Sequence, residues 1–184
     1  YPSAIQQQEE GLRKMREILF GGISNGEGNA FASKKENKWI FGQYVHRTKY
    51  YGDEDDTPYI IEGGELDADY YDCFVVYPDT VCQYTGLKDK NGVRVFENDI
   101  LKYSDKESHT VVYGVVRFGL STKDYQVEDS QRLFGFYIDW LGKSKKFTLP
   151  WRRIWRPDIA YWVRKEKATV YGNIFDNDIK ELGE

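Results

Sequence analysis

The chain has 184 residues, enough for one sizeable hydrophobic core or two small ones. Tyr, Phe and Trp make up 16% of the residues, which favours a folded, aromatic-packed interior over a disordered chain. The formal net charge is only −4, and no run of about 18 apolar residues is present, so no transmembrane helix is predicted. No signal peptide precedes Met15, and we therefore expect the protein in the cytoplasm.

Residues 1–14 precede the first expected strand and are interpreted as an N-terminal extension or an expression remnant. Within them, Ser3 and Gln6 fit a capping box, which predicts a short helix from Ala4.

A first strand is expected over residues 16–20, followed by a stretch with four glycines at residues 21–28. Glycine enrichment of this kind is typical of a loop. A phosphate-binding loop would need a helix N-terminus with a Lys after it, whereas the residues that follow are polar and strand-like. We therefore predict an ordinary loop at residues 21–28.

Further strands are predicted in the first half of the chain from runs of β-branched and aromatic residues between turn signals. These runs are Trp39–Val45, which follows a turn at Asn37-Lys38, then Tyr59–Ile61, Phe74–Tyr77 and Val81–Tyr84.

The sequence contains no clear metal or cofactor pattern. The acidic run at residues 53–56 lacks the central glycine and the closing glutamate of an EF-hand, so a solvated loop is favoured over a calcium site. Two cysteines and two distant histidines do not form a zinc pattern. For Cys73 and Cys82, two buried thiols are favoured over a disulfide in a cytoplasmic chain. We expect no catalytic residue, no metal and no cofactor.

Residues 83–103 contain the clearest local pattern. Asn91-Gly92 lies between apolar-alternating runs and predicts a hairpin turn in which both residues accept positive φ. A strand is expected over 93–96, then a turn at Glu97-Asn98-Asp99, then a strand over 100–103. Gly86, Asn91, Gly92 and Asp99 are interpreted as residues that shape turns rather than residues with a chemical role.

Later strands are expected at residues 110–118, 134–140 and 168–175, and Asp176-Asn177 is expected to cap a terminal helical turn. Short strands with this spacing favour a small antiparallel barrel. Gly114, inside the strand at 110–118, is predicted to mark a bulge or a corner of that barrel.

Three motifs resemble those of a known family. The segments QYTGLKDKNG (83–92) and FENDIL (96–101) resemble the signature of the YopX family of bacteriophage and prophage proteins, and VYGNIFDND (170–178) is similar to its closing motif. The family usually has glycine where this chain has Asn98, which can also adopt the left-handed conformation. The resemblance implies a phage-encoded protein of a bacterial host and names no reaction.

The charges are unevenly distributed. Residues 53–82 hold ten acidic residues and no basic one, and residues 143–167 hold nine basic residues against two acidic ones. This asymmetry suggests a partner, either nucleic acid or the opposite block of the same or a neighbouring subunit.

The basic aromatic segment at residues 140–167 has two interpretations. Trp and Arg side chains could stack on bases and contact phosphates, and the candidates are Trp151, Trp155, Arg152, Arg153 and Arg156. Alternatively, the tryptophans belong to the core, because exposing several of them to water is costly. The second interpretation is favoured.

The sequence therefore predicts a mainly β protein with a short N-terminal helix. The expected domains are an N-terminal β portion (15–86) and a C-terminal barrel of the Src-homology-3 type (87–184) that carries the insertion at 140–167. We expect a non-enzymatic phage accessory protein that acts by protein–protein association as a homo-oligomer. A host protein or a small ligand is a further candidate partner, nucleic acid or nucleotide binding through 140–167 is the alternative, and no membrane partner is expected.

Overall fold

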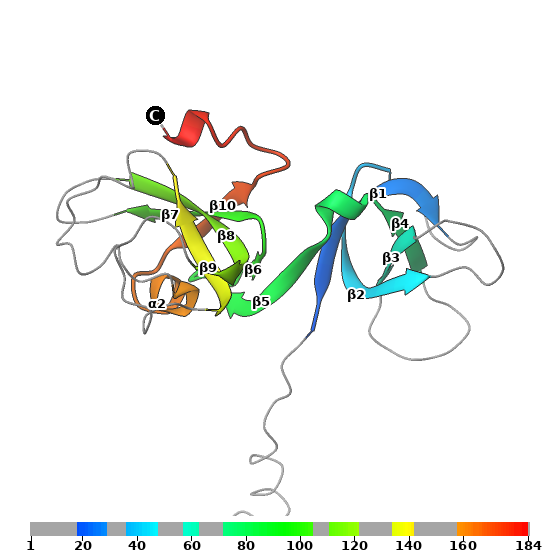
Figure 1. Ribbon diagram of the computed structural model, residues 1–184, viewed down its shortest axis with the longest axis horizontal. Helices are drawn as coiled ribbons and strands as arrows, with labels where there is room; N and C mark the ends of the chain where they lie inside the picture. The colour runs from blue at the N-terminus through cyan, green and yellow to red at the C-terminus, as the bar shows by residue number, and fades with distance from the viewer. Residues whose placement is uncertain are drawn as a thin grey trace, which may run out of the picture.

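The protein is mainly β and consists of two lobes that lie side by side, as the computed structural model shows (Figure 1). The structure describes residues 18–28, 36–47, 57–62, 72–104, 111–121, 134–141 and 158–183. Within these ranges the single α-helix is α2 (Ile159–Arg164), in the C-terminal lobe. The helix predicted from Ala4 lies outside the described residues. None of the described helices is long and apolar enough to cross a membrane.

The N-terminal lobe is a closed barrel of four antiparallel strands. They are β1 (Phe20–Gly28), β2 (Trp39–Arg47), β3 (Thr57–Glu62) and β4 (Asp72–Val76). Each strand pairs with the next, and β4 pairs back onto β1, which closes the ring. The core inside is small and consists of the buried side chains of Ile40, Ile60, Phe74 and Val76.

The glycine-rich stretch is a strand, so the prediction of a loop at residues 21–28 is wrong. A Cβ added to Gly22 would lie 3.1 Å from Ile60 Cδ1 and 3.1 Å from Val76 Cβ. A Cβ on Gly21 would lie 3.0 Å from the ring of Phe41. In this narrow barrel the glycines leave room for side chains of the facing strands, rather than providing a flexible turn.

Strand β5 (Cys82–Lys88) belongs to both lobes. Its first residues pair with β1 (Phe20↔Gln83), and its later residues pair with β6 (Arg94–Phe96). The division between the lobes that is predicted at residue 86 therefore falls inside a strand. In Figure 1, β5 runs from one lobe into the other without a separate linker.

The C-terminal lobe contains a four-stranded antiparallel sheet in the order β10-β7-β8-β9. Its strands are β7 (Asp99–Ser104), β8 (Val111–Leu120), β9 (Phe134–Trp140) and β10 (Thr169–Asn173). The β5–β6 hairpin contributes to its core, and so does α2. Pairing among these strands does not close a ring within the described residues, so the closed barrel is the N-terminal one.

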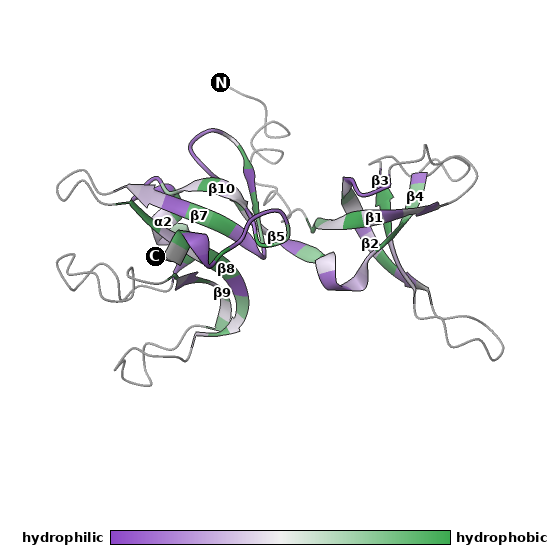
Figure 2. Ribbon diagram, turned by 90° about the horizontal axis from the view of Figure 1, so that it is seen from above, coloured by the Kyte–Doolittle hydropathy of each residue, from purple (hydrophilic) through white to green (hydrophobic). Residues whose placement is uncertain are grey.

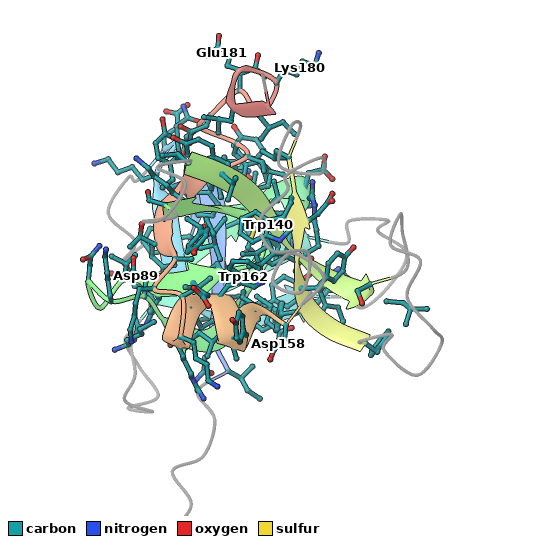
Figure 3. All side chains as sticks on the ribbon, turned by 90° about the vertical axis from the view of Figure 1, so that its left-hand side faces the viewer. Asp89, Trp140, Asp158, Trp162, Lys180 and Glu181 are labelled. Atoms are coloured by element: carbon teal, nitrogen blue, oxygen red, sulfur yellow. The ribbon has the colours of Figure 1, made fainter. Side chains whose placement is uncertain are left out.

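Helix α2 covers one face of this sheet and places a tryptophan in its core. Asp158 caps the helix because its carboxylate accepts the N–H of Ala160 at 2.9 Å. Trp162 packs edge-on against Trp140 of β9, with ring centroids 4.8 Å apart, and Figure 3 shows both inside the lobe. In Figure 2, the hydrophobic residues of these strands appear as green segments of the ribbon. The core consists of the buried residues Leu87, Val95, Leu101, Tyr103, Val112, Val116, Ile138, Trp140, Ile159, Trp162, Val163 and Ala168.

Gly114 has a packing role and does not mark the predicted bulge. The pairing of β8 with β7 and with β9 continues through this residue without a shift in register. A Cβ at Gly114 would instead lie 2.8 Å from Cε3 of Trp140 and would also meet Ile138. Glycine is therefore required here by the indole ring on the neighbouring strand.

The turns of the signature are present, with one difference in conformation. Gly92 has a φ of +82°, but Asn91 does not share the positive φ that was predicted for it. The loop instead runs from Asp89 to Val93, and Asp89 Oδ1 accepts the N–H groups of Asn91 at 2.8 Å and Val93 at 3.0 Å. Asn98 has a φ of 64°, which confirms its left-handed conformation.

Candidate functional site: a pocket between the lobes

A cavity of about 530 Å³ lies where the two lobes meet. It takes residues from β2, β5, β6, β7 and β10, and most of its lining is apolar. The lining residues are Trp39, Phe41, Cys82, Val93, Arg94, Phe96, Glu97, Asp99, Val170 and Asn173.

One wall of the pocket is aromatic. Trp39 and Phe41 are two residues apart on β2, so their side chains project from the same face of the strand. Their rings are stacked with centroids 6.1 Å apart, and Phe41 lies 5.1 Å from the ring of Phe96 on β6. Phe41 is 42% exposed although it packs against these rings, so the wall remains accessible from solvent.

The chain's closing motif fixes this wall in place. Trp39 Nε1 donates to Asp176 Oδ2 at 3.1 Å, across 137 residues of sequence. Asn173 Nδ2 donates to the same oxygen at 2.7 Å, and Asn173 Oδ1 accepts the N–H of Asp176 at 3.0 Å. The ring of Phe175 lies 5.8 Å from that of Trp39. The Asn and Asp residues of VYGNIFDND therefore orient an aromatic side chain of the other lobe.

The polar end of the pocket is centred on Asp99. Its Oδ2 accepts the backbone N–H of Phe96 at 2.7 Å, which closes the turn at residues 97–98. Within the described part of the chain no donor reaches its other oxygen, Oδ1. Burial raises the pKa of this carboxyl from its ordinary value of 3.8 to about 7, against a smaller lowering by the Phe96 hydrogen bond.

The turn that carries Asp99 is hydrogen-bonded to two other strands, β5 and β8. Glu97 N–H donates to the carbonyl of Gln83 at 2.9 Å, and Asn98 N–H donates to that of Val116 at 2.8 Å. Asn98 Oδ1 also accepts from Arg117 Nη1 at 2.7 Å. Asp99 is thus positioned by β5 and β8 as well as by its own strand.

Cys82 lines the pocket as a buried thiol outside any disulfide, as predicted. Its Sγ donates to the carbonyl of Thr80 at 3.2 Å and accepts from Asn98 Nδ2 at 3.5 Å. Burial raises the pKa of this thiol to about 11. Because the thiolate is the reactive form, Cys82 is a poor nucleophile at neutral pH. Cys73 is half-buried and not in a disulfide, so the expectation of two buried thiols holds for Cys82 and not for Cys73.

The structure brings together only part of what the sequence indicated. Trp151, Trp155, Arg152, Arg153 and Arg156 lie outside the described residues. Further along the same segment, Trp162 is only 1% exposed, as expected for a core tryptophan.

Gly92 shapes its turn, and Gly86 has a positive φ of 82°. Asp99 closes a turn as predicted and also lines the pocket. No cluster of three or more metal-binding side chains occurs in the described ranges.

The aromatic wall was not found from the sequence. Trp39, Phe41 and Phe96 occur in runs that also read as ordinary strands, and they meet only when the lobes pack together. One signal was available: Trp39 and Phe41 alternate with the buried Ile40, so an aromatic pair on the opposite face of β2 could have been identified as a surface in need of a partner.

The family model described as YopX protein matches residues 30–179. No curated protein matches the chain. The crystal structure of protein EF1440 from Enterococcus faecalis is 19% identical, with a TM-score of 0.40, and the match covers 91% of this chain and 99% of that one. Because the family model spans most of its length, the chain belongs to the YopX family.

Proposed function

We propose that this YopX protein is a non-enzymatic binding protein that takes a small ligand into the pocket between its lobes. The observation that carries the proposal is the aromatic wall of Trp39, Phe41 and Phe96 around an accessible cavity. A volume of about 530 Å³ falls within the range of about 300–1,000 Å³ that is usual for small-molecule sites. As a phage or prophage accessory protein in the cytoplasm of its host, it would act by sequestering or sensing that ligand.

The chemistry of the lining supports binding rather than catalysis. Cys82 is held as a neutral thiol at neutral pH. Among the described residues, Asp99 is the one group whose pKa is raised to near neutrality. A carboxyl without an adjacent nucleophile is better suited to orienting a ligand than to breaking a bond.

Ligand-observed NMR with a library of small aromatic fragments tests this proposal. Fragments should bind to the parent protein and lose binding in Trp39→Ser. Phe118→Ser is the matched control, because Phe118 is a 48% exposed aromatic residue of β8 outside the pocket, and this variant should bind like the parent. Equal binding to Trp39→Ser and the parent would contradict the proposal.

Association with a second copy is the second candidate function. The end of the β8–β9 hairpin carries exposed apolar side chains: Phe134 is 72% exposed and Leu120 is 44% exposed. Phe118 packs edge-on against Phe134 and Phe136, with ring centroids 5.6 and 5.0 Å apart. An exposed aromatic group of this kind is a feature of interaction surfaces.

Light scattering at low and high salt tests the homo-oligomer. An oligomer held by the aromatic hairpin should persist in 1 M salt and dissociate in Phe134→Ser. An oligomer held by the acidic and basic blocks should weaken at 1 M salt, where the Debye length is about 3 Å. A monomer under every condition would remove this candidate.

Two further proposals rank lower. One is nucleic-acid binding through residues 140–167, and the other is the Src-homology-3 character of the C-terminal lobe. For the first, Trp fluorescence should show no saturable quenching by mixed oligonucleotides at low salt. Quenching that is lost in Arg152→Ala/Arg153→Ala would reverse this ranking.

A further inference from the structure

We propose that the pocket selects a flat cationic ligand, an aryl amidinium in its simplest form, with the ring against Trp39 and Phe41 and an N–H group donating to Asp99 Oδ1. This inference rests on the proposed function and adds the chemical class of the ligand. Three observations on different elements support it: the aromatic wall, the open carboxylate oxygen, and the balance of charge around the cavity.

The first observation is the pair of flat aromatic rings on one wall of the pocket. Trp39 and Phe41 are stacked with their planes only 14° apart, so β2 offers two nearly parallel ring faces. The negative face of an indole or phenyl ring attracts a cation, and a flat ligand gains contact area as well. Trp39 cannot rotate away freely because its indole N–H is held by Asp176.

The second observation is the carboxyl itself. Asp99 is anchored through Oδ2 to the Phe96 N–H, so that its position is fixed while Oδ1 accepts no bond from the described residues. Among the described residues Trp140 Nε1 is the one fully buried polar side-chain atom without a partner, so Asp99 Oδ1 stays open to the cavity, where a ligand can reach it. A charged N–H donor would supply the missing bond, and charge-assisted hydrogen bonds are about twice as strong as neutral ones.

The third observation is the sign of the surrounding charge. The pocket lining contains two carboxyl groups, Glu97 and Asp99, against one basic residue, Arg94. Arg94 is exposed and lies over the ring of Tyr84 at 5.9 Å, so it is at the rim rather than in the interior. Arg117 on β8 is bonded to Asn98, and Asp176 is bonded to Trp39 and Asn173. A ligand anion would therefore meet like charge from Glu97 and Asp99.

Calorimetric titration with three probes of nearly the same shape tests the inference at about pH 8, where Asp99 is mostly ionised. Benzamidine is the cation, benzamide the neutral analogue and benzoate the anion. We expect benzamidine to bind at least about tenfold more tightly than benzamide, and benzoate to bind most weakly. In Asp99→Asn the preference for benzamidine should disappear while benzamide affinity stays within about threefold of the parent.

The pH dependence gives a second readout. The ionised carboxylate is the form that receives the cation, and its pKa is about 7. Benzamidine affinity should therefore rise about tenfold between about pH 6 and pH 8 in the parent, and not in Asp99→Asn. Glu97→Gln is the control for a general charge effect, since it removes a neighbouring acid and should keep the rise.

The outcomes separate the two proposals. Equal binding of all three probes to the parent, lost in Trp39→Ser, would leave the binding function in place and overturn the cationic class. Binding of none of the three would overturn the inference, while the fragment screen decides on the binding function. N-acetylarginine amide carries similar donors on an aliphatic stem and should bind more weakly than benzamidine, because it lacks the ring. Tighter binding would assign the pocket to an arginine side chain instead and overturn the small aromatic ligand.

Discussion

The two lobes both form a β core, but they pack it in opposite ways. The N-terminal barrel has four buried core side chains and brings its strands together through glycines that face neighbouring side chains and backbone. The C-terminal lobe packs a helix onto a sheet and fills the space between them with large residues, Trp140 and Trp162 among them. One lobe depends on side chains that are absent, and the other depends on side chains that are present.

This difference predicts which substitutions each lobe tolerates. The barrel should be damaged by added atoms, because the Cβ positions of Gly22 and Gly42 already lie against neighbouring strands. The C-terminal lobe should be damaged by removed atoms, because the neighbours of a large buried residue cannot fully collapse into the space it leaves.

The largest effect is expected from Trp162→Ala in the filled lobe. Trp162 is 1% exposed and contacts the rings of Trp140, Tyr103 and Tyr161. Its truncation should lower the free energy of unfolding by about 3–5 kcal/mol. Chemical denaturation measures the change, and Trp162→Phe, which keeps most of the volume, should cost clearly less. A loss below about 1 kcal/mol would show that this core is loosely packed.

The barrel is tested by Gly42→Ala, which adds a single methyl group. Its Cβ would overlap the carbonyl oxygen of Ile61 on β3, and a backbone atom in a paired strand cannot move aside cheaply. We expect a loss of about 1–3 kcal/mol in unfolding free energy. Gln43→Ala, at the adjacent exposed position, is the control and should have little effect. If both variants melt at the parent temperature, the close approach of β2 and β3 is wrong.

A smaller effect is expected at the turn of the β5–β6 hairpin. Gly92 has a φ of +82° and nothing within 4 Å of its Cβ position, so a substitution meets backbone strain and no clash. Gly92→Val should therefore destabilise the fold by about 1–2 kcal/mol, as measured by thermal melting. Lys90→Val, in the same exposed turn, supplies the comparison without the positive φ. Coincident melts of Gly92→Val and the parent would exclude the turn conformation.

The last prediction concerns the pH dependence of stability, which should change in Asp99→Asn. The pKa of Asp99 is about 7 in the folded state and near 3.8 when unfolded, so the folded state binds more protons between these values. The parent should lose stability as the pH rises through this window and then level off. The Asp99→Asn variant should lack that loss. Its stability relative to the parent should therefore be higher at about pH 8 than at about pH 4. A parallel pH profile for the two proteins would show that the carboxyl is not buried at the junction.

The sequence predicted local structure well where side-chain pattern and burial agree. The strand at Phe134–Trp140 has the predicted bounds, and the strand at 39–45 is present within β2. The left-handed Asn98 was also correct, because turn chemistry depends on the residue itself. In each case the information lies within a few neighbouring residues.

The prediction failed where the reason for a residue lies on another strand. Gly21 and Gly22 look like loop residues by composition, and only the facing Ile60, Val76 and Phe41 explain them. The pocket was out of reach for the same reason, since Trp39 and Asp176 meet across 137 residues. A motif rich in Asn and Asp indicated turns, but it did not indicate which distant aromatic ring those turns would hold.

The bond between Trp39 and Asp176 has a consequence for the synthesis of the protein on the ribosome. β1 to β4 are complete once Val76 has been made, so the barrel can close while most of the chain is still missing. The pocket takes one wall from this early part and another from β10 and the residues after it. A nascent chain should therefore acquire its ligand site only when the end of the YopX match emerges, which makes binding competence a late event in translation.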